Sequence, residues 1–193
     1  DNEMVYDFYT STYEEVVLDG ASVTGGADKS VTLNASEGCV KFPATIRSPL
    51  VTVTRFDAKV SFSGNGEYSV SFNDKNGNQI AVLLIAIQNG NIGIYEYTES
   101  GKSETPLAEF DVEGYFSLTL EWYKNEQMIA VLKDGKLMAL TSMYYSDGSV
   151  NEWAESFEIS AQGGDGRVDI DNVRCENLYE IFKLPEDFDS ENT

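Results

Sequence analysis

The fold of this chain is decided by residues Phe116–Tyr123, which read FSLTLEWY, and by the segments that follow them. Apolar and polar residues alternate along this run, as they do in a strand with one buried face. Met128–Lys133 has the character of a second strand, and the turn Asp134-Gly135-Lys136 closes it. An Asp-Gly pair between alternating runs is the strongest short-range hairpin signal. These residues therefore predict consecutive antiparallel strands.

A further strand signature follows at Arg167–Val173, which reads RVDIDNV. Its inward apolar residues flank Asp169 and Asp171. Turns rich in glycine and asparagine recur roughly every ten residues, which is the rhythm of a sandwich or barrel rather than of alternating strands and helices. The sequence therefore predicts an all-β protein, built as a two-sheet antiparallel sandwich.

Strands are expected through most of the chain, and no long helix is expected. The expected strands are Val5–Tyr9, Val16–Leu18, Ser30–Leu33, Cys39–Phe42, Thr52–Ser63, Glu67–Asn73, Ile80–Ile87, Ile92–Tyr97, Leu107–Asp111, Tyr115–Tyr123, Met128–Lys133, Leu137–Ser142, Phe157–Ala161 and Arg167–Cys175. Ile80–Ile87 is apolar on both faces, so it is expected to be a central strand that is covered on both sides.

Composition limits the partners. Against 13 basic residues the chain carries 33 acidic ones, for a formal net charge of −20. Such a surface repels phosphate backbones and anionic lipids, so nucleic acid and membranes are not expected as partners. Polyanionic glycans are disfavoured for the same reason. A neutral polysaccharide or glycan is therefore the favoured partner, and a ligand bridged by a cation also fits.

The chain contains no histidine. This excludes the Ser-His-Asp and Cys-His triads and most zinc and copper sites. The longest apolar run, Ile80–Ile87, is too short to span a bilayer. The chain begins at Asp1, which suits either a secreted protein whose signal peptide has been removed or an artificial boundary. We expect a secreted or cell-surface protein.

Two cysteines are present, Cys39 and Cys175. The first and last strands of a sandwich are often neighbours, so a disulfide between them is one interpretation, and secretion would support it. The other interpretation is a pair of buried free thiols that act as small apolar residues.

At this point the chain resembles the concanavalin A-like lectin/glucanase superfamily, and within it the laminin G-like domains. The resemblance rests on Phe116–Trp122, the Asp134-Gly135-Lys136 hairpin, Phe157–Ser160 and Val168–Val173, and it covers about Val51 to Leu178. It implies a jelly-roll sandwich. The superfamily includes lectins, glycosidases, lyases and adhesion modules, so the resemblance does not select a function.

The enzymes of this superfamily provide a test. Its retaining glucanases carry a Glu-x-Asp-x-Glu strand, which sets two carboxylates about 5 Å apart. This chain has only the pairs Asp111-Val-Glu113 and Asp169-Ile-Asp171. The constellation of the alginate-lyase-like members includes a histidine, which is absent. No catalytic residue is therefore predicted, and catalysis by an unfamiliar carboxylate pair stays open as the alternative.

Asp169 and Asp171 are the strongest polar candidates of the chain. Together with Asp165, or with an N-terminal carbonyl, they are candidate ligands of a structural Ca²⁺, which takes six to eight oxygens. The alternative is that these aspartates face solvent or accept backbone hydrogen bonds at a sheet edge.

Sugar rings stack on exposed aromatic side chains, while polar neighbours bind the hydroxyls. The loop Met143–Trp153 is the richest candidate, because loops on a rigid sandwich are where binding residues concentrate. Its predicted ligand-binding residues are Tyr144, Tyr145, Asn151 and Trp153. A second set on the strands is Tyr95, Tyr97, Glu121 and Tyr123. The alternative is that these aromatic residues pad the sheets under neighbouring loops.

The organisation predicted is a single sandwich domain over residues 1–184 and an acidic tail or linker over residues 185–193, as in one module of a larger secreted protein. We expect a non-catalytic carbohydrate-binding or adhesion module. The alternatives are a glycoside hydrolase or polysaccharide lyase of the same superfamily, or a structural or protein-interaction domain.

Overall fold

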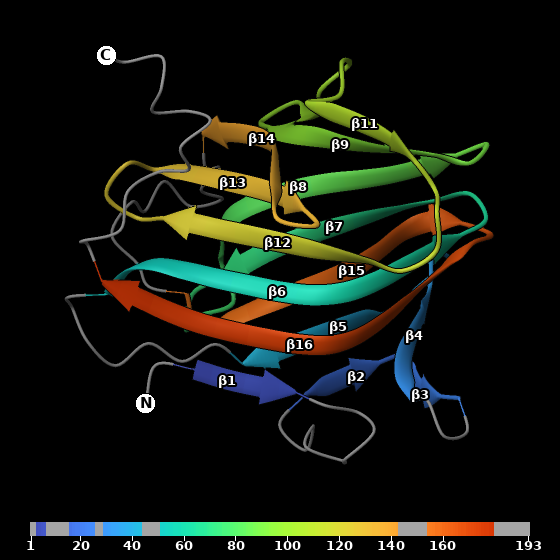
Figure 1. The fold of residues 1–193 in the computed structure, drawn as a ribbon, viewed down its shortest axis with the longest axis horizontal. Coiled ribbons are helices and arrows are strands. Elements are labelled where there is room, and N and C mark those ends of the chain that lie inside the picture. The colour runs from blue at the N-terminus through green and yellow to red at the C-terminus, as the bar shows by residue number, and fades with distance from the viewer. Residues whose placement is uncertain (1–2, 7–15, 26–28, 44–50, 143–153, 180–193) are drawn as a thin grey trace.

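A computed structural model describes residues 3–6, 16–25, 29–43, 51–142 and 154–179 (Figure 1). All regular elements in these ranges are strands, and they form two eight-stranded antiparallel sheets. The sheets pack face to face as a jelly-roll sandwich, which confirms the predicted fold class. No helix that would be long and apolar enough to cross a membrane occurs in the described ranges.

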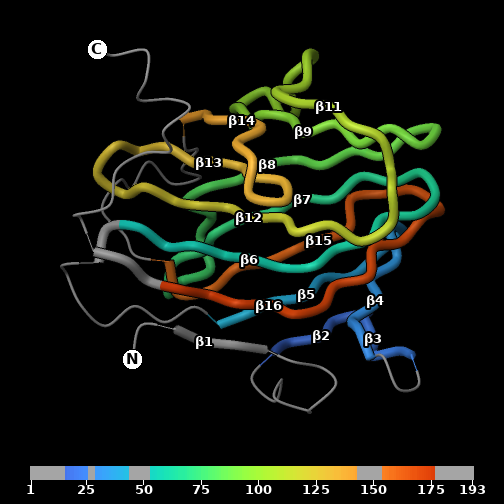
Figure 2. Tube along the Cα trace, viewed as in Figure 1, coloured from blue at the N-terminus to red at the C-terminus, as the bar shows by residue number. Residues whose placement is uncertain are grey.

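The first sheet, called sheet I here, runs in the order β14-β13-β12-β6-β16-β4-β3, and β1 also pairs with β16. Its strands are β1 (Glu3–Tyr6), β3 (Ser22–Thr24), β4 (Ser30–Asn34), β6 (Val51–Ser63), β12 (Phe116–Tyr123), β13 (Met128–Lys133), β14 (Lys136–Ser142) and β16 (Arg167–Tyr179). Strands β6 and β16 lie side by side although they are far apart in the sequence (Figure 2).

The second sheet, sheet II, runs in the order β10-β9-β8-β7-β15-β5-β2, and β11 also pairs with β9. Its strands are β2 (Val17–Asp19), β5 (Cys39–Pro43), β7 (Gly66–Asn73), β8 (Gln79–Gln88), β9 (Asn91–Thr98), β10 (Gly101–Lys102), β11 (Ala108–Asp111) and β15 (Ser156–Gly164). Strand β8 is central and its outward Val82 and Leu84 are buried, so the prediction for Ile80–Ile87 is confirmed.

The core lies between the two sheets and is rich in aromatic rings. Phe56 of sheet I stacks on Phe157 of sheet II with ring centroids 3.4 Å apart. Phe157 in turn meets Phe72 edge-on at 5.1 Å. The predicted alternation explains this packing, because Phe56, Phe72 and Phe157 all occupy inward positions of their strands.

The Asp134-Gly135 hairpin forms between β13 and β14, as predicted. Both residues have positive φ, 49° and 81°, which aspartate tolerates and glycine adopts freely. The carboxylate of Asp134 accepts a hydrogen bond of 2.9 Å from the backbone N–H of Ser117 at the start of β12. This contact lowers the pKa of Asp134 and ties the hairpin to the neighbouring strand.

The two cysteines are not bridged, so the disulfide prediction is wrong for this structure. Cys39 belongs to β5 of sheet II, where it pairs with Ser160. Cys175 is buried on β16 of sheet I, where it pairs with the inward-facing Phe56. The last strand does lie beside early strands, but those are β4 and β1 rather than β5. The alternative of two free thiols therefore describes the structure.

Candidate functional site

The outer side of sheet II carries a row of polar residues across β7 and β15, and four of them, Ser69, Ser71, Asn73 and Ser156, are buried. Period-two alternation turns the outward residues of these strands away from the core, and most of them are small or carry amide or carboxylate groups. They are Glu67, Ser69, Ser71, Asn73, Ser156, Glu158, Ser160 and Gln162. We call this set the β7/β15 face.

Side chains of the β7/β15 face are held by hydrogen bonds to one another. The amide of Gln162 donates to the hydroxyl of Ser69 over 3.1 Å. The hydroxyl of Ser160 donates to Glu158 over 3.0 Å. Ser71 donates to the buried Asn73, also over 3.0 Å. These bonds fix the direction in which the remaining donors and acceptors point.

A pocket of about 400 Å³ opens at one end of this face. It is lined by Asn65, Gly66, Glu67, Ala86, Ile87, Gln88, Lys102, Gln162 and Gly163. Three amides, one carboxylate and one ammonium group therefore line the pocket beside Ala86 and three other residues without polar side chains. The pocket is shallow and mostly polar, and its volume lies within the range of small-ligand sites.

Lys102 reaches into this pocket from the short strand β10. Its Nζ lies 2.9 Å from Glu67 Oε2 and 4.7 Å from the centroid of the Tyr95 ring. The Tyr95 ring also lies against Gly93, where a Cβ atom would come within 2.7 Å of a ring carbon. Tyr95 therefore supports Lys102 and does not present an open ring to solvent.

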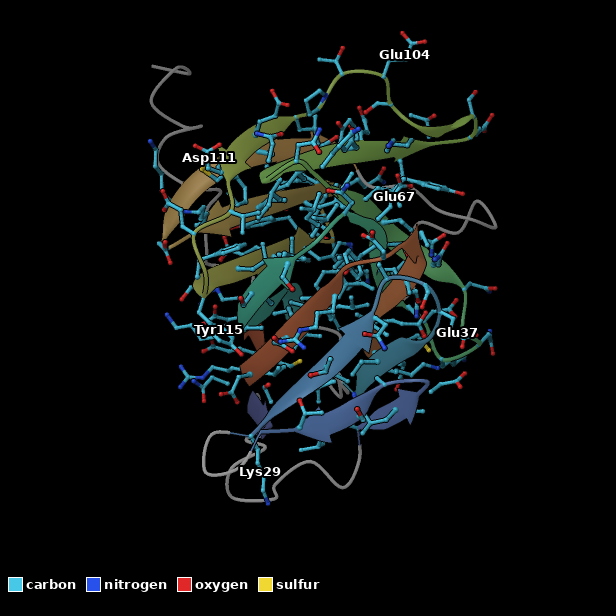
Figure 3. All side chains as sticks on the ribbon, turned by 90° about the vertical axis from the view of Figure 1, so that its right-hand side faces the viewer. Lys29, Glu37, Glu67, Glu104, Asp111 and Tyr115 are labelled. Atoms are coloured by element: carbon cyan, nitrogen blue, oxygen red, sulfur yellow. The ribbon has the colours of Figure 1, made fainter. Side chains whose placement is uncertain are left out.

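Asn65 joins three turns at the pocket end of the sandwich, the end that faces the viewer in Figure 3. Its side-chain oxygen accepts a 3.0 Å hydrogen bond from the N–H of Asn89 in the β8–β9 turn. Its backbone carbonyl accepts hydrogen bonds from Asp165 and Gly166 in the β15–β16 turn, at 3.0 and 2.7 Å. The pocket therefore rests on a fixed frame of turns.

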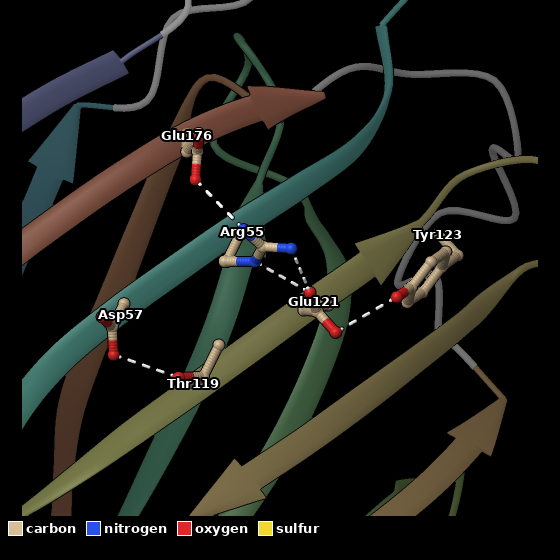
Figure 4. Close-up of polar contacts among 6 residues, drawn as sticks. All are labelled: Arg55, Asp57, Thr119, Glu121, Tyr123 and Glu176. Atoms are coloured by element: carbon tan, nitrogen blue, oxygen red, sulfur yellow. Dashed lines mark hydrogen bonds and ion pairs between the residues drawn. The ribbon is translucent and has the colours of Figure 1, made fainter. Parts of the chain in front are cut away.

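The outer face of sheet I carries a second polar cluster, centred on Glu121 (Figure 4). Glu121 is buried, and one of its oxygens accepts hydrogen bonds from Arg55 at 2.8 Å. The other accepts a hydrogen bond of 3.1 Å from the hydroxyl of Tyr123. Arg55 also contacts Glu176 on β16 at 3.1 Å. Three strands, β6, β12 and β16, are thus cross-linked.

The charges of this cluster are mutually stabilised. Burial raises the pKa of the Tyr123 phenol, and the adjacent carboxylate of Glu121 raises it further, so the hydroxyl remains a donor. Burial alone would lower the pKa of Arg55, but the hydrogen bond to Glu121 and the charges of Glu121 and Glu176 leave it raised. Both carboxylate oxygens of Glu121 already accept hydrogen bonds from Arg55 and Tyr123. The cluster therefore stabilises sheet I rather than offering a ligand site.

The four predicted strand residues do not form one site. Tyr95 and Tyr97 lie on β9 of sheet II, whereas Glu121 and Tyr123 lie on β12 of sheet I, on the opposite side of the sandwich. The predictions for Tyr144, Tyr145, Asn151 and Trp153 fall outside the described residues. The predicted tail, 185–193, also falls outside them.

The three predicted calcium ligands have partners within the protein. Asp169 accepts a 2.7 Å hydrogen bond from Thr32 and lies 3.5 Å from Arg167. Asp165 accepts from the backbone of Asn65, and Asp171 accepts from that of Asn172. Across the part of the chain that the structure describes, no group of three or more histidine, cysteine or acidic residues is placed to hold a metal ion. Calcium binding stays a prediction, which melting curves in calcium and in EDTA test.

Sequence reasoning missed Glu67, Lys102 and Gln162. Glu67 was expected at the start of a strand, Glu67–Asn73, but nothing in the sequence distinguished it from an ordinary solvated residue. The contact between Gln162 and Ser69 joins positions 93 residues apart, so it depends on the pairing of β7 with β15. Lys102 lies on a two-residue strand, which leaves no periodic signal.

No family model matches this chain, and no curated protein matches its sequence. Solved structures share its fold. A carbohydrate esterase of the Shiga toxin-encoding bacteriophage phi24B is 15% identical with a TM-score of 0.63, and the match covers 90% of this chain and 97% of the esterase chain. A sialidase gives a TM-score of 0.67 at 15% identity, covering 91% of this chain but 18% of the sialidase.

The carbohydrate-binding module CBM66 of Bacillus subtilis is 14% identical with a TM-score of 0.52, covering 83% of this chain and 94% of the module. These structures share the two-sheet sandwich fold of this chain. At such low identities, the comparisons show the fold alone.

Proposed function

We propose that this chain is a carbohydrate-binding domain of the laminin G-like type, and that the pocket at the end of the β7/β15 face is the binding site. The observation that carries the proposal is the convergence of Glu67, Lys102, Gln162 and the amides of Asn65 and Gln88 on one pocket. Amide, carboxylate and ammonium groups are the partners that sugar hydroxyls need. The names of the similar structures, a carbohydrate esterase, a sialidase and a carbohydrate-binding module, support the same class of ligand.

Binding without chemistry is favoured over glycoside hydrolysis by the spacing of the acids on this face. Glu158 pairs with Ser71 on β7, and Glu67 lies four residues before Ser71. Four strand residues span about 13 Å. The two carboxylates of a glycosidase stand about 5–5.5 Å apart in retaining enzymes and about 6.5–9.5 Å apart in inverting ones. Glu67 and Glu158 therefore lack the spacing of such a pair.

A neutral glycan is favoured over an acidic one. The formal net charge of −20 repels polyanions, and the ammonium group of Lys102 is already paired with Glu67. A neutral chain brings no charge that must be compensated. We further propose a secreted or cell-surface location, within a larger protein, where such polysaccharides occur.

The test is affinity electrophoresis through gels that contain a soluble polysaccharide. β-Glucan, arabinoxylan, galactomannan and levan serve as neutral probes, and alginate and polygalacturonate as acidic ones. We expect retardation by at least one neutral polysaccharide and none by the acidic ones. Gln162→Ala should weaken the retardation while leaving the melting temperature nearly unchanged, because this side chain is exposed.

The matched control is Asn76→Ala, which removes an exposed amide in the turn between β7 and β8, outside the pocket. It should bind as the wild type does. Retardation by no neutral polysaccharide, or equal retardation of the Gln162→Ala variant, would contradict the proposal. Release of reducing ends during incubation would instead favour the enzyme alternative.

A further inference from the structure

Tyr115 is exposed at the start of β12, on the side of the sandwich opposite the β7/β15 face. Its relative exposure is 55%, and the large apolar or aromatic side chains exposed among the described residues are only Tyr115 and Val17. Figure 3 shows Tyr115 and Glu67 on opposite sides of the molecule. The other aromatic rings of the residues whose side chains the structure describes are buried or half-buried, so the surroundings of this exposed ring matter.

Tyr115 lines a pocket of about 220 Å³ together with Ser30, Lys59, Asp171 and Asn172. These residues come from β4, β6 and β16 and from the residue just before β12. The pocket therefore has one aromatic wall and four polar side chains. It is separate from the Glu121 cluster, with which it shares no residue.

The backbone of β16 shapes this pocket. Asp171 pairs with Lys59 of β6, and the register then shifts between Asp171 and Arg174. At this bulge Asn172 adopts a positive φ of 49°, and its N–H donates a 2.8 Å hydrogen bond to the carboxylate of Asp171. A bulge redirects side chains beside a sheet, and it is often found next to a binding site. Here it places the exposed amide of Asn172 beside Tyr115.

We propose that this pocket, the Tyr115 pocket, binds a single neutral sugar ring as a second carbohydrate site. The ring stacks on Tyr115, while Lys59, Asp171 and Asn172 provide one ammonium, one carboxylate and one amide for its hydroxyls. The acid and the base balance each other in charge, which suits an uncharged ligand. This inference rests on the proposed function, since it takes the ligand class from there.

The consequence is bivalence. Sheet I carries the Tyr115 pocket and sheet II carries the β7/β15 face, so one molecule presents sites on both sides of the sandwich. Two such sites let one domain contact two polysaccharide chains. Linked binding of this kind raises the affinity for an insoluble polymer without any new contact.

The test is a titration of ¹⁵N-labelled protein, followed by amide shifts, with D-glucose, D-galactose, D-mannose, D-xylose and N-acetyl-D-glucosamine in turn. We expect at least one sugar to cause saturable shifts at Asn172 and Ser30. Tyr115→Ala should weaken this binding about fivefold or more, by analogy with the stacking of bases on aromatic rings. Tyr115→Phe keeps the ring and should bind within about twofold of the wild type, since little of the stacking surface is lost.

Val17→Ala is the matched control, because it removes the other exposed apolar side chain, on β2 of sheet II. It should bind as the wild type does. Lys59→Ala provides a second variant of the pocket should Tyr115→Ala fold poorly, and it should also weaken binding. The inference is overturned if no sugar shifts Asn172 and Ser30, or if the pocket variants bind as tightly as the wild type.

The same spectra separate this inference from the proposed function. Shifts confined to Ser69, Ser160 and Gln162 would overturn the Tyr115 pocket and support the β7/β15 face. Shifts confined to Asn172 and Ser30 would support the Tyr115 pocket and contradict sugar binding at the β7/β15 face.

Discussion

Glu121 shows how a residue can look like a ligand contact in the sequence and serve stability in the structure. Its carboxylate is buried and accepts hydrogen bonds from both Arg55 and Tyr123. A buried donor that loses its acceptor bears the full cost of its removal from water. The role of Glu121 is therefore best measured as stability.

We predict that Glu121→Ala lowers the free energy of unfolding by about 3 kcal/mol, because Arg55 and Tyr123 lose their shared acceptor. Tyr123→Phe removes only one hydrogen bond and should cost about 1 kcal/mol. Urea unfolding followed by tryptophan fluorescence measures both. A loss below about 0.5 kcal/mol for Glu121→Ala, the level of an ordinary surface change, would show that the cluster contributes little.

Alkaline pH should destabilise the protein, because a buried thiol and two buried phenols have raised pKa values. Burial raises the pKa of the Cys175 thiol to about 12 from its ordinary value of 9.0. It also raises the pKa values of Tyr68 and Tyr123 above their ordinary 10.0. In each case the unfolded chain loses its proton first, so the stability is fully present below the ordinary pKa and is lost as the pH rises toward the folded one.

We therefore predict that the free energy of unfolding falls from pH 9 upward, by up to about 1.4 kcal/mol per pH unit for each group. Cys175→Ala should flatten the part of this slope between pH 9 and 10. Urea unfolding at stepped pH provides the measurement. An equal slope in the variant would mean that Cys175 does not titrate in the unfolded chain, as in a disulfide, and thiol counting would then find fewer than two thiols.

At the scale of elements, the strands with clear alternation were predictable. Phe116–Tyr123 and Met128–Lys133 form β12 and β13, and the Asp134-Gly135 turn forms where expected. The strands β3 and β10 were missed, since three and two residues are too few for a period to show. The extension of β16 to Tyr179 was also missed, because it depends on pairing with β6.

The candidate sites were harder to predict than the strands. Tyr115 was expected to begin a strand and lies just before β12, but its neighbour Asn172 reaches it only through the bulge in β16. Asp171 was singled out for its carboxylate and given a different role. Residue type and period locate the face of a side chain, whereas the register between distant strands decides which side chains meet.

The turns between the two sheets lead to a prediction at this scale. Gly166 is buried, and a Cβ atom there would overlap the carbonyl oxygen of Ser63 and lie 2.7 Å from the carbonyl carbon of Gly64. Since both contacts are backbone, neither can move aside. We predict that Gly166→Ala costs about 2–3 kcal/mol of unfolding free energy, as overpacking does.

Gly77→Ala is the comparison, because a Cβ at Gly77 meets no atom within 4 Å. Its φ of +83° alone should cost about 1 kcal/mol. Equal losses for the two variants in urea unfolding would mean that the β15–β16 turn adjusts more readily than its contacts indicate.

At the scale of the whole molecule, the charge leads to a prediction about salt. Binding of a polyanion releases counterions and changes steeply with ionic strength, whereas a neutral glycan releases none. We predict that the affinity for the retarding neutral polysaccharide changes less than about twofold between 50 and 500 mM sodium chloride. Isothermal titration calorimetry at both concentrations measures it. A steep dependence would indicate that charged groups of the glycan contribute, against the neutral assignment.

The position of β16 has a consequence for how the chain is made. In sheet I this strand pairs with β6 on one side and with β4 and β1 on the other, so these three strands have open edges until residues 167–179 have left the ribosome. Pairings between such distant segments form late and slowly. Sheet I therefore cannot be completed before β16 has been made, and a product truncated before β16 would expose the open edges of β6, β4 and β1 to aggregation.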